Sequence, residues 1–309
     1  FSVLYIYPNS RTTKNEGVMV SFKILDGALG SELIMRGLTL PKHIWSADAN
    51  ITSPKIVQKI HQEYVDAGTD YITANTFRTT PRAYKKIGTS KPEETARASL
   101  YKAVEIAKKA ACNSVKVAGA IAPLEDCYSP NLFPGRDVAV AEFSQLGKWL
   151  VGAGVEILLL ETMNSAAETE AALIGIQNYD LNIWVSLVLR DESHLLSGDS
   201  LIDTLNLIKN YPVAVVLINC NPLNRTVIAA EILASIWPNK WGVYPNLGVG
   251  NPSPNGYILH YEKMDCFLSA MEKIIKLEPI ILGACCGSSS NHISKLFELR
   301  KQYDITSGT

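Results

Sequence analysis

The sequence carries at residues 215–222 the run Val215-Val216-Leu217-Ile218-Asn219-Cys220-Asn221-Pro222, in which apolar, mostly β-branched residues give way to polar ones and a proline. Such a run is typical of a strand buried in a parallel sheet and followed by a turn. A second run, Leu282-Gly283-Ala284-Cys285-Cys286-Gly287-Ser288-Ser289, places two adjacent thiols where an apolar strand meets a Gly/Ser turn. If both strands belong to one barrel, the sulfurs of Cys220, Cys285 and Cys286 could meet.

Three cysteine thiolates and an open fourth position are the ligand set of a catalytic zinc site. Neighbouring residues on a regular strand point to opposite faces, so Cys285 and Cys286 could hold one ion only if the strand stops there. Gly287 permits a turn at that point because it adopts backbone angles that other residues avoid. The alternatives for the dipeptide are thiols packed as small hydrophobic groups, or a vicinal disulfide. Cys220, at an equivalent strand end, favours the metal site.

Short apolar runs recur along the chain, each followed by a turn and a stretch with helical periodicity, which indicates consecutive βα units with parallel strands. Helix starts are marked at Thr52-Ser53-Pro54, before a helix predicted over residues 55–67, and at Asn164-Ser165, before one over residues 166–179. The predicted strands end near eight positions, which are Asp26, Asn75, Ala122, Glu161, Leu189, Cys220, Asn246 and Cys286.

Eight βα units predict an α/β protein with a single (β/α)8 TIM barrel, whereas a doubly wound open sheet would need a different strand order. We assign residues 21–309 to the barrel and residues 1–20 to an N-terminal extension or a remnant of cloning. Residues 125–137 and 247–261 are predicted to form long loops at the C-terminal face of the strands. Active sites of such barrels form at that face.

The composition excludes several classes of function. The chain has 309 residues, 47% of them hydrophobic, and a formal net charge of −1, which offers no basic surface for nucleic acid or for a membrane. No run approaches the roughly 18 apolar residues of a membrane span. Six cysteines in a chain of this length are expected to be reduced thiols, so we expect a cytoplasmic protein without a disulfide framework.

Two carboxylates and several amides accompany the thiols at the predicted strand ends. Asp26 follows Lys23-Ile24-Leu25, and Glu161 follows a run of leucines. A carboxylate buried there needs a partner, which the ammonium group of an amino acid could supply; a helix cap or an internal salt bridge is the alternative. Three further side chains could hydrogen-bond a substrate at the same mouth or satisfy turn backbone, namely Asn75, Thr76 and Asn246.

Other catalytic patterns are missing from the sequence. The five histidines show no paired metal spacing, and His61 and His292 are expected to have surface or helix-capping roles. There is no Walker loop, no Gly-x-Gly-x-x-Gly after a strand and no Gly-x-Ser-x-Gly, so chemistry on a nucleotide or an acyl-enzyme is not indicated. No lysine ends a predicted strand, which argues against Schiff-base chemistry.

From residue 22 onward the chain resembles the zinc-dependent homocysteine S-methyltransferases, a family that also supplies the homocysteine-binding barrel of cobalamin-dependent methionine synthase. The motifs that carry the resemblance follow one another in the family's order. They are Leu25-Asp26-Gly27-Ala28-Leu29-Gly30-Ser31-Glu32-Leu33, Ile44-Trp45-Ser46-Ala47, Thr73-Ala74-Asn75-Thr76-Phe77, Leu160-Glu161-Thr162-Met163, Ile218-Asn219-Cys220, Tyr244-Pro245-Asn246-Leu247-Gly248 and Gly283-Ala284-Cys285-Cys286-Gly287.

The resemblance implies that the three thiols hold Zn²⁺ and that the sulfur of L-homocysteine takes the open position, since coordination converts a thiol to a thiolate at neutral pH. It also implies that Asp26 and Glu161 bind the homocysteine ammonium, and that backbone N–H groups after Asp26, from Gly27 onward, bind its carboxylate. The implied reaction is an in-line attack of the thiolate on an activated methyl carbon, which forms methionine.

The methyl donor is expected to be a sulfonium compound, S-methylmethionine or S-adenosylmethionine. The residues after Phe77 are Arg78-Thr79-Thr80-Pro81, without the aromatic residue expected of betaine enzymes. At 309 residues the chain is expected to be too short for the folate, cobalamin and activation modules of methionine synthase. Residues 121–130 nevertheless resemble the methionine-synthase branch, so a module that receives its methyl group from a corrinoid or folate donor stays as the alternative.

Two further hypotheses remain open on sequence alone. The chain could be a non-catalytic barrel that binds zinc and homocysteine, or a metal-free aldolase-type barrel with structural cysteines. The partners expected for the enzyme are small molecules, and the resemblance also allows a corrinoid protein or a second copy of the chain.

Overall fold

Parallel strands form the centre of the computed structural model, which describes residues 22–250, 253 and 256–307. The extension predicted at residues 1–20 lies outside these residues. The strands of the main sheet are β1 (Lys23–Ile24), β2 (Tyr71–Ala74), β3 (Lys116–Ile121), β4 (Ile157–Met163), β5 (Asn182–Leu187), β6 (Val213–Pro222), β7 (Trp241–Asn246) and β10 (Ile281–Leu282). Their order is β1-β10-β7-β6-β5-β4-β3-β2, and every pair is parallel.

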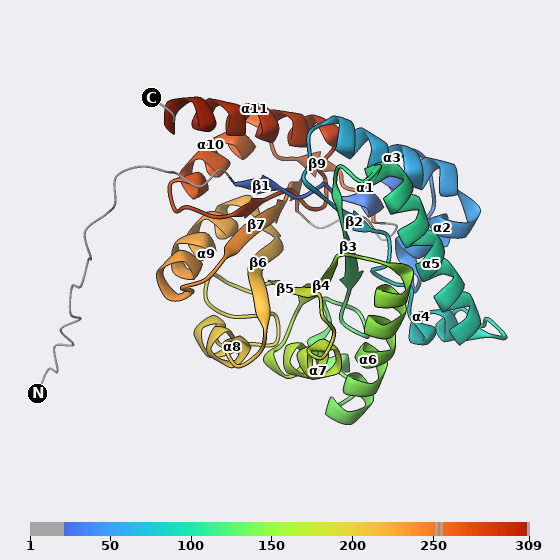
Figure 1. The fold of residues 1–309 in the computed structure, drawn as a ribbon. Helices are drawn as coiled ribbons and strands as arrows, with labels where there is room; N and C mark the ends of the chain where they lie inside the picture. Colours follow the sequence, from blue (N-terminus) through green and yellow to red (C-terminus); the bar gives the residue numbers. More distant parts are fainter. Residues whose placement is uncertain (1–21, 251–252, 254–255, 308–309) are drawn as a thin grey trace, which may run out of the picture.

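The sheet closes on itself between its first and last strands. Leu25 forms a parallel bridge with Tyr71, the amide of Asp26 donates to the Tyr71 oxygen at 3.0 Å, and the amide of Asp70 donates to the Ile24 oxygen at 2.8 Å. With helices around the closed sheet, the architecture is the predicted (β/α)8 barrel (Figure 1).

The helices lie outside the sheet (Figure 1). They are α1 (Leu29–Met35), α2 (Ala49–Thr52), α3 (Pro54–Asp66), α4 (Pro81–Lys86), α5 (Pro92–Ala111), α6 (Arg136–Ala153), α7 (Ala166–Ile176), α8 (Leu201–Ile208), α9 (Leu223–Ile236), α10 (Met264–Ile275) and α11 (Ser290–Ser307). The predicted starts of α3 and α7 are correct, and the Ser165 hydroxyl caps α7 by accepting from the amide of Glu168. None of the helices in the described part of the chain is long and apolar enough to cross a membrane.

The predicted loops both follow strands at the C-terminal face but are not structureless. The first contains a short 3-10 helix, Pro130–Leu132, and ends where α6 begins at Arg136. The second contains a small antiparallel hairpin formed by β8 (Gly248–Val249) and β9 (His260–Tyr261).

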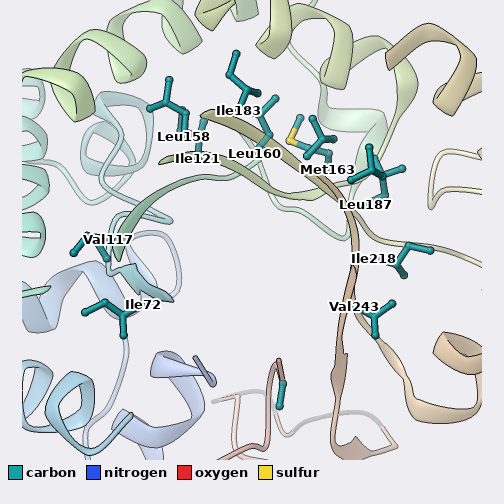
Figure 2. Packing of buried hydrophobic residues seen from close by; sticks show 14 of the residues in the cluster. Ile72, Val117, Ile121, Leu158, Leu160, Met163, Ile183, Leu187, Ile218 and Val243 are labelled. Carbon is teal, nitrogen blue, oxygen red and sulfur yellow. The ribbon is translucent and has the colours of Figure 1, made fainter. Parts of the chain in front are cut away.

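Each strand contributes to two apolar layers, which explains why the strands are apolar on both faces. Leu159 and Leu217 belong to the cluster that fills the barrel interior. Leu158, Leu160 and Ile218 point the other way, from the sheet toward the surrounding helices (Figure 2). The interior and exterior residues therefore alternate along each strand with a period of two.

The surface or capping role expected of the two histidines is correct for only one of them. His292 accepts from the amide of Ser289 at 3.2 Å near the start of α11. His61 in α3 is fully buried, and neither ring nitrogen has a hydrogen-bond partner. The helical pattern around His61 does not reveal that its face packs inward, and burial lowers its pKa from 6.5 to about 4.

The buried His61 is expected to make the protein sensitive to acid. Below pH 6.5 the unfolded chain binds a proton at this residue and the folded chain does not, so stability falls as the pH decreases toward 4. His61→Leu removes this effect: relative to the parent, its free energy of unfolding should rise by about 2 kcal/mol between pH 7.5 and pH 5. Urea titrations at both pH values measure it. The same substitution at exposed His43 is the control, and equal changes in both variants would contradict the prediction.

Candidate active site

A cavity of about 260 Å³ opens at the C-terminal ends of the strands. It brings together the two carboxylates and the three thiols that the sequence placed at separate strand ends. Its walls include Asp26, Gly27, Trp45, Asn75, Phe77, Tyr128, Glu161, Thr162, Cys220, Tyr244, Asn246, Cys285 and Cys286. Among the predicted site residues, Thr76 alone is not part of this lining.

The sulfurs of Cys220, Cys285 and Cys286 all lie within 4.8 Å of one another. Cys220 Sγ is 3.8 Å from Cys286 Sγ, and Cys285 Sγ is 4.0 Å from Cys286 Sγ. All six cysteines are free. Three converging thiols at a cavity wall match the soft ligands that zinc prefers, and the cavity leaves one side of the cluster open to a further ligand.

Two unusual backbone conformations bring the sulfurs together. Gly287 has φ +83°, so the chain turns directly after Cys286, as predicted. Cys220 itself has φ +56°, a left-handed conformation that is rare for residues other than glycine and that the sequence did not indicate. The adjacent glycine is enough to permit the turn after Cys285 and Cys286. The left-handed backbone of Cys220 must instead be stabilised by contacts with the surrounding residues.

The thiols share hydrogen bonds that favour one thiolate within the cluster. Donation from Cys220 and Cys285 holds the pKa of Cys286 well below its usual value of 9.0. Hydrogen bonds to the other two sulfurs raise the pKa of Cys285 well above that value. The hydroxyl of Tyr128, from the loop after β3, lies 3.1 Å from Cys220 Sγ.

Asp26 lies at the end of β1, where its side chain is buried among strands. Its oxygens accept from the Thr73 amide at 2.9 Å and from the Thr73 hydroxyl at 3.1 Å. Burial raises the pKa of Asp26 well above 3.8, although the two hydrogen bonds act in the opposite direction. No cation of the described residues forms an ion pair with it.

Glu161 ends the leucine run of β4 and faces the same cavity. Burial raises its pKa from 4.5 to about 7, against a hydrogen bond that its Oε1 accepts from the Tyr244 hydroxyl at 3.2 Å. Sequence reasoning missed Tyr244, which lies two residues before Asn246 on β7. Its position inside a predicted strand gave no sign that its hydroxyl reaches a carboxylate on another strand.

Gly27 lies close to two side chains from distant parts of the sequence, those of Ser288 and Tyr64. A Cβ atom there would come within 2.6 Å of both the Ser288 Oγ and the Tyr64 hydroxyl, so only glycine fits without a shift. The next amide, that of Ala28, already donates to Ser288 Oγ at 3.0 Å. The N–H groups expected to bind a carboxylate after Asp26 therefore do not include that of Ala28 in this structure.

The three predicted polar residues have different surroundings. The Asn75 side chain lines the cavity but is engaged by Ser46 and Asn50, with distances of 2.6–2.8 Å. The Thr76 hydroxyl donates to the Ala120 oxygen at 2.8 Å. Asn246 lines the cavity and accepts from the Gly248 amide at 2.8 Å, and its Nδ2 donates to no side chain or backbone oxygen of the described residues.

An aromatic wall lines part of the cavity. Trp45, Phe77 and Tyr128 contribute to it. Trp45 has φ +48°, and its indole ring lies between two glycines: a Cβ would approach the ring within 2.6 Å at Gly30 and 2.3 Å at Gly256. Both glycines thus make space for the indole.

The model of the family described as homocysteine S-methyltransferase matches residues 23–299. The homocysteine S-methyltransferase of Escherichia coli strain K12 is 30% identical over 246 residues, which are 73% of this chain and 77% of that protein. Homocysteine S-methyltransferase 2 of Zea mays is 25% identical over 298 residues, 87% of each chain.

A solved structure gives the same match. The metallated form of the homocysteine methyltransferase MmuM from Escherichia coli superposes with a TM-score of 0.79 at 26% identity. The match covers 90% of this chain and 96% of that one.

Proposed function

This chain belongs to the homocysteine S-methyltransferase family and is an enzyme that methylates homocysteine to methionine, and from that premise we propose that its metal is zinc and its methyl donor a sulfonium compound. The observation that carries the proposal is the meeting of the three thiols of Cys220, Cys285 and Cys286 with two carboxylates in one cavity. An amino acid with a terminal thiol would complement both sets of groups, because its ammonium would face the carboxylates and its sulfur would face the thiol cluster.

The carboxylates of Asp26 and Glu161 would bind the ammonium group of homocysteine. Asp26 is buried and Glu161 is half-buried, and desolvation raises the pKa of each, because an unpaired negative charge is poorly solvated there. A bound ammonium supplies the missing positive charge and favours the ionised carboxylates. Tyr244 orients Glu161 for this contact through its hydroxyl, and Thr73 orients Asp26.

Cys220, Cys285 and Cys286 would hold the zinc ion. The chemistry that zinc supplies when bound is the stabilisation of a coordinated thiolate at neutral pH, at which a free thiol is mostly protonated. The ammonium contacts direct the other end of the amino acid, so that its sulfur lies at the open side of the thiol cluster. Holding the sulfur and the methyl carbon in line, with water excluded, lowers the entropic part of the barrier.

The aromatic wall supports a cationic donor. Aromatic faces attract a cation within about 6 Å of the ring centroid, and Trp45, Phe77 and Tyr128 line the same cavity as the carboxylates. A sulfonium already carries the charge that activates its methyl group, so no acid of the protein has to protonate the leaving sulfur. A cavity of about 260 Å³ favours the smaller donor, S-methylmethionine, over S-adenosylmethionine.

The donor is tested with reduced, zinc-loaded protein and homocysteine, in parallel assays with S-methylmethionine, S-adenosylmethionine and betaine. We expect methionine formation with S-methylmethionine to be fastest, and a chelator to abolish it. Turnover with betaine alone, or with a methylated corrinoid protein alone, would contradict the sulfonium proposal. Homocysteine binding without methyl transfer from any donor would favour the non-catalytic barrel. A corrinoid partner, a homo-oligomer and a cytoplasmic location stay predictions.

A further inference from the structure

The sulfur of Cys220 lies on the face of β6 opposite to the one that regular strand geometry predicts. Leu217 faces the barrel interior, and Ile218 points outward to the helices (Figure 2). Because side chains alternate between the two faces of a strand, that of Cys220 should point outward, as that of Ile218 does. Its left-handed backbone, φ +56°, instead brings the sulfur within 3.8 Å of that of Cys286 at the cavity.

The strand that carries Glu161 has the same irregularity at the same level. Thr162, the next residue, has φ +61°, although β-branched residues rarely adopt this conformation. The pairing of β4 with β5 shifts register between Leu160 and Met163, and that of β6 with β7 shifts between Asn219 and Pro222. Each strand therefore has a bulge at its site residue, Glu161 in β4 and Cys220 in β6.

A buried chain of hydrogen bonds joins the two bulges. Asn219 is 0% exposed and lies directly before Cys220. Its Nδ2 donates to Thr162 Oγ1 at 2.9 Å, and its Oδ1 accepts from Ser186 Oγ at 2.7 Å. Three strands, β4, β5 and β6, are thus connected by three buried side chains.

A second buried amide holds the other side of Cys220. Asn221, 1% exposed, donates from Nδ2 to the Asn219 backbone oxygen at 2.9 Å and accepts at Oδ1 from the Leu189 amide, also at 2.9 Å. Cys220 lies between two asparagines whose polar groups are engaged on both sides. These bonds supply the stabilisation that its left-handed backbone requires.

We propose that Asn219, through Ser186 and Thr162, is a positioning residue that sets the separation between the Glu161 carboxylate and the Cys220 sulfur, and thereby selects the thiol substrate by its length. The proposal rests on the proposed function, in which the carboxylates bind the ammonium and the thiol cluster receives the sulfur. Cysteine is one methylene shorter than homocysteine and cannot reach both ends of a site held at the longer spacing. A misplacement of about 1 Å can cost a hundredfold in rate.

The test removes one bond of the chain without changing the shape of the side chain. Thr162→Val deletes the acceptor for Asn219, and Thr162→Ser retains it. Thr204→Val is the matched control, because it deletes a buried hydroxyl that donates at 2.8 Å to the oxygen of Ser200, the residue before α8, and that does not line the cavity. The measurements are Co²⁺ affinity, from the thiolate charge-transfer band, and the ratio of kcat/KM for homocysteine to that for cysteine.

We expect Thr162→Val to weaken Co²⁺ binding about tenfold and to lower the selectivity ratio at least fivefold, with Thr162→Ser within about twofold of the parent. Thr204→Val should change neither quantity. If Thr162→Val does not fold, Ser186→Ala breaks the same chain at its other end and should give the same result.

The proposal is overturned if Thr162→Val, or Ser186→Ala in its place, matches Thr204→Val in both measurements, because the chain would then contribute only to stability. If the parent protein does not methylate homocysteine, the proposed function fails. The Co²⁺ titration then still decides whether the chain positions Cys220, because it does not depend on turnover.

Discussion

Cys286→Ser is expected to lose metal and activity together. Cys286 is the central sulfur of the cluster, 3.8 Å from that of Cys220 and 4.0 Å from that of Cys285, so the substitution leaves only two thiols on separate strands. Substitution of a residue that only supports a metal ligand typically lowers metal affinity or activity about 10–100-fold. Loss of a ligand itself should therefore lower metal affinity and methionine formation by on the order of a thousandfold or more.

Zinc content per chain, measured by mass spectrometry after dialysis, and methionine formation from homocysteine check this result. Cys266→Ser is the matched control, since that thiol is exposed on α10 and does not belong to the cluster. A Cys286→Ser protein that retains full activity without metal would contradict the metal site. Loss of activity with zinc retained would assign Cys286 a role other than that of a ligand.

Glu161→Gln is expected to stabilise the protein at alkaline pH while it weakens substrate binding. Burial raises the pKa of Glu161 from 4.5 to about 7. Between these values the unfolded chain releases the proton that the folded chain retains, so the glutamate lowers stability progressively as the pH rises and by its full amount above 7. The glutamine variant avoids this cost and should be more stable by about 3 kcal/mol at pH 8, but only by about 1 kcal/mol at pH 5.

The same substitution removes one of two charges that would face the homocysteine ammonium, so KM for homocysteine should rise about 10–100-fold. Chemical denaturation at both pH values and steady-state kinetics measure the two effects. Glu94→Gln, on the exposed surface of α5, should change neither. A variant that is less stable than the parent at pH 8 would show that Glu161 is already paired in the free protein.

Much of the fold could be predicted because it depends on local pattern. Apolar runs of strand length that alternate with helical periodicity give parallel strands, and closure of such strands into a barrel follows from their number and connections. The start of α7 could also be predicted from local sequence, because the Ser165 hydroxyl caps the helix by accepting from an amide three residues later. His61 shows the limit, because a helical pattern does not say which neighbours cover a given face.

The site could be predicted where one residue type carries the chemistry. The three cysteines and the two carboxylates were identified from their places at strand ends, and the structure brings all five to one cavity. Tyr244, Asn219 and Thr162 were not identified. Each acts through a hydrogen bond to another strand, and the partners lie 33–83 residues away along the chain.

The sequence by itself determined the βα order, the soft ligand set and the turn after Cys286, because a glycine permits that turn locally. Only the tertiary structure decided that Cys220 faces the cavity. Strand periodicity would direct this thiol toward the helices, and a left-handed residue other than glycine persists only where its neighbours stabilise it. Those neighbours are the buried amides of Asn219 and Asn221, whose partners on β4 and beyond the end of β5 become adjacent only when the barrel closes.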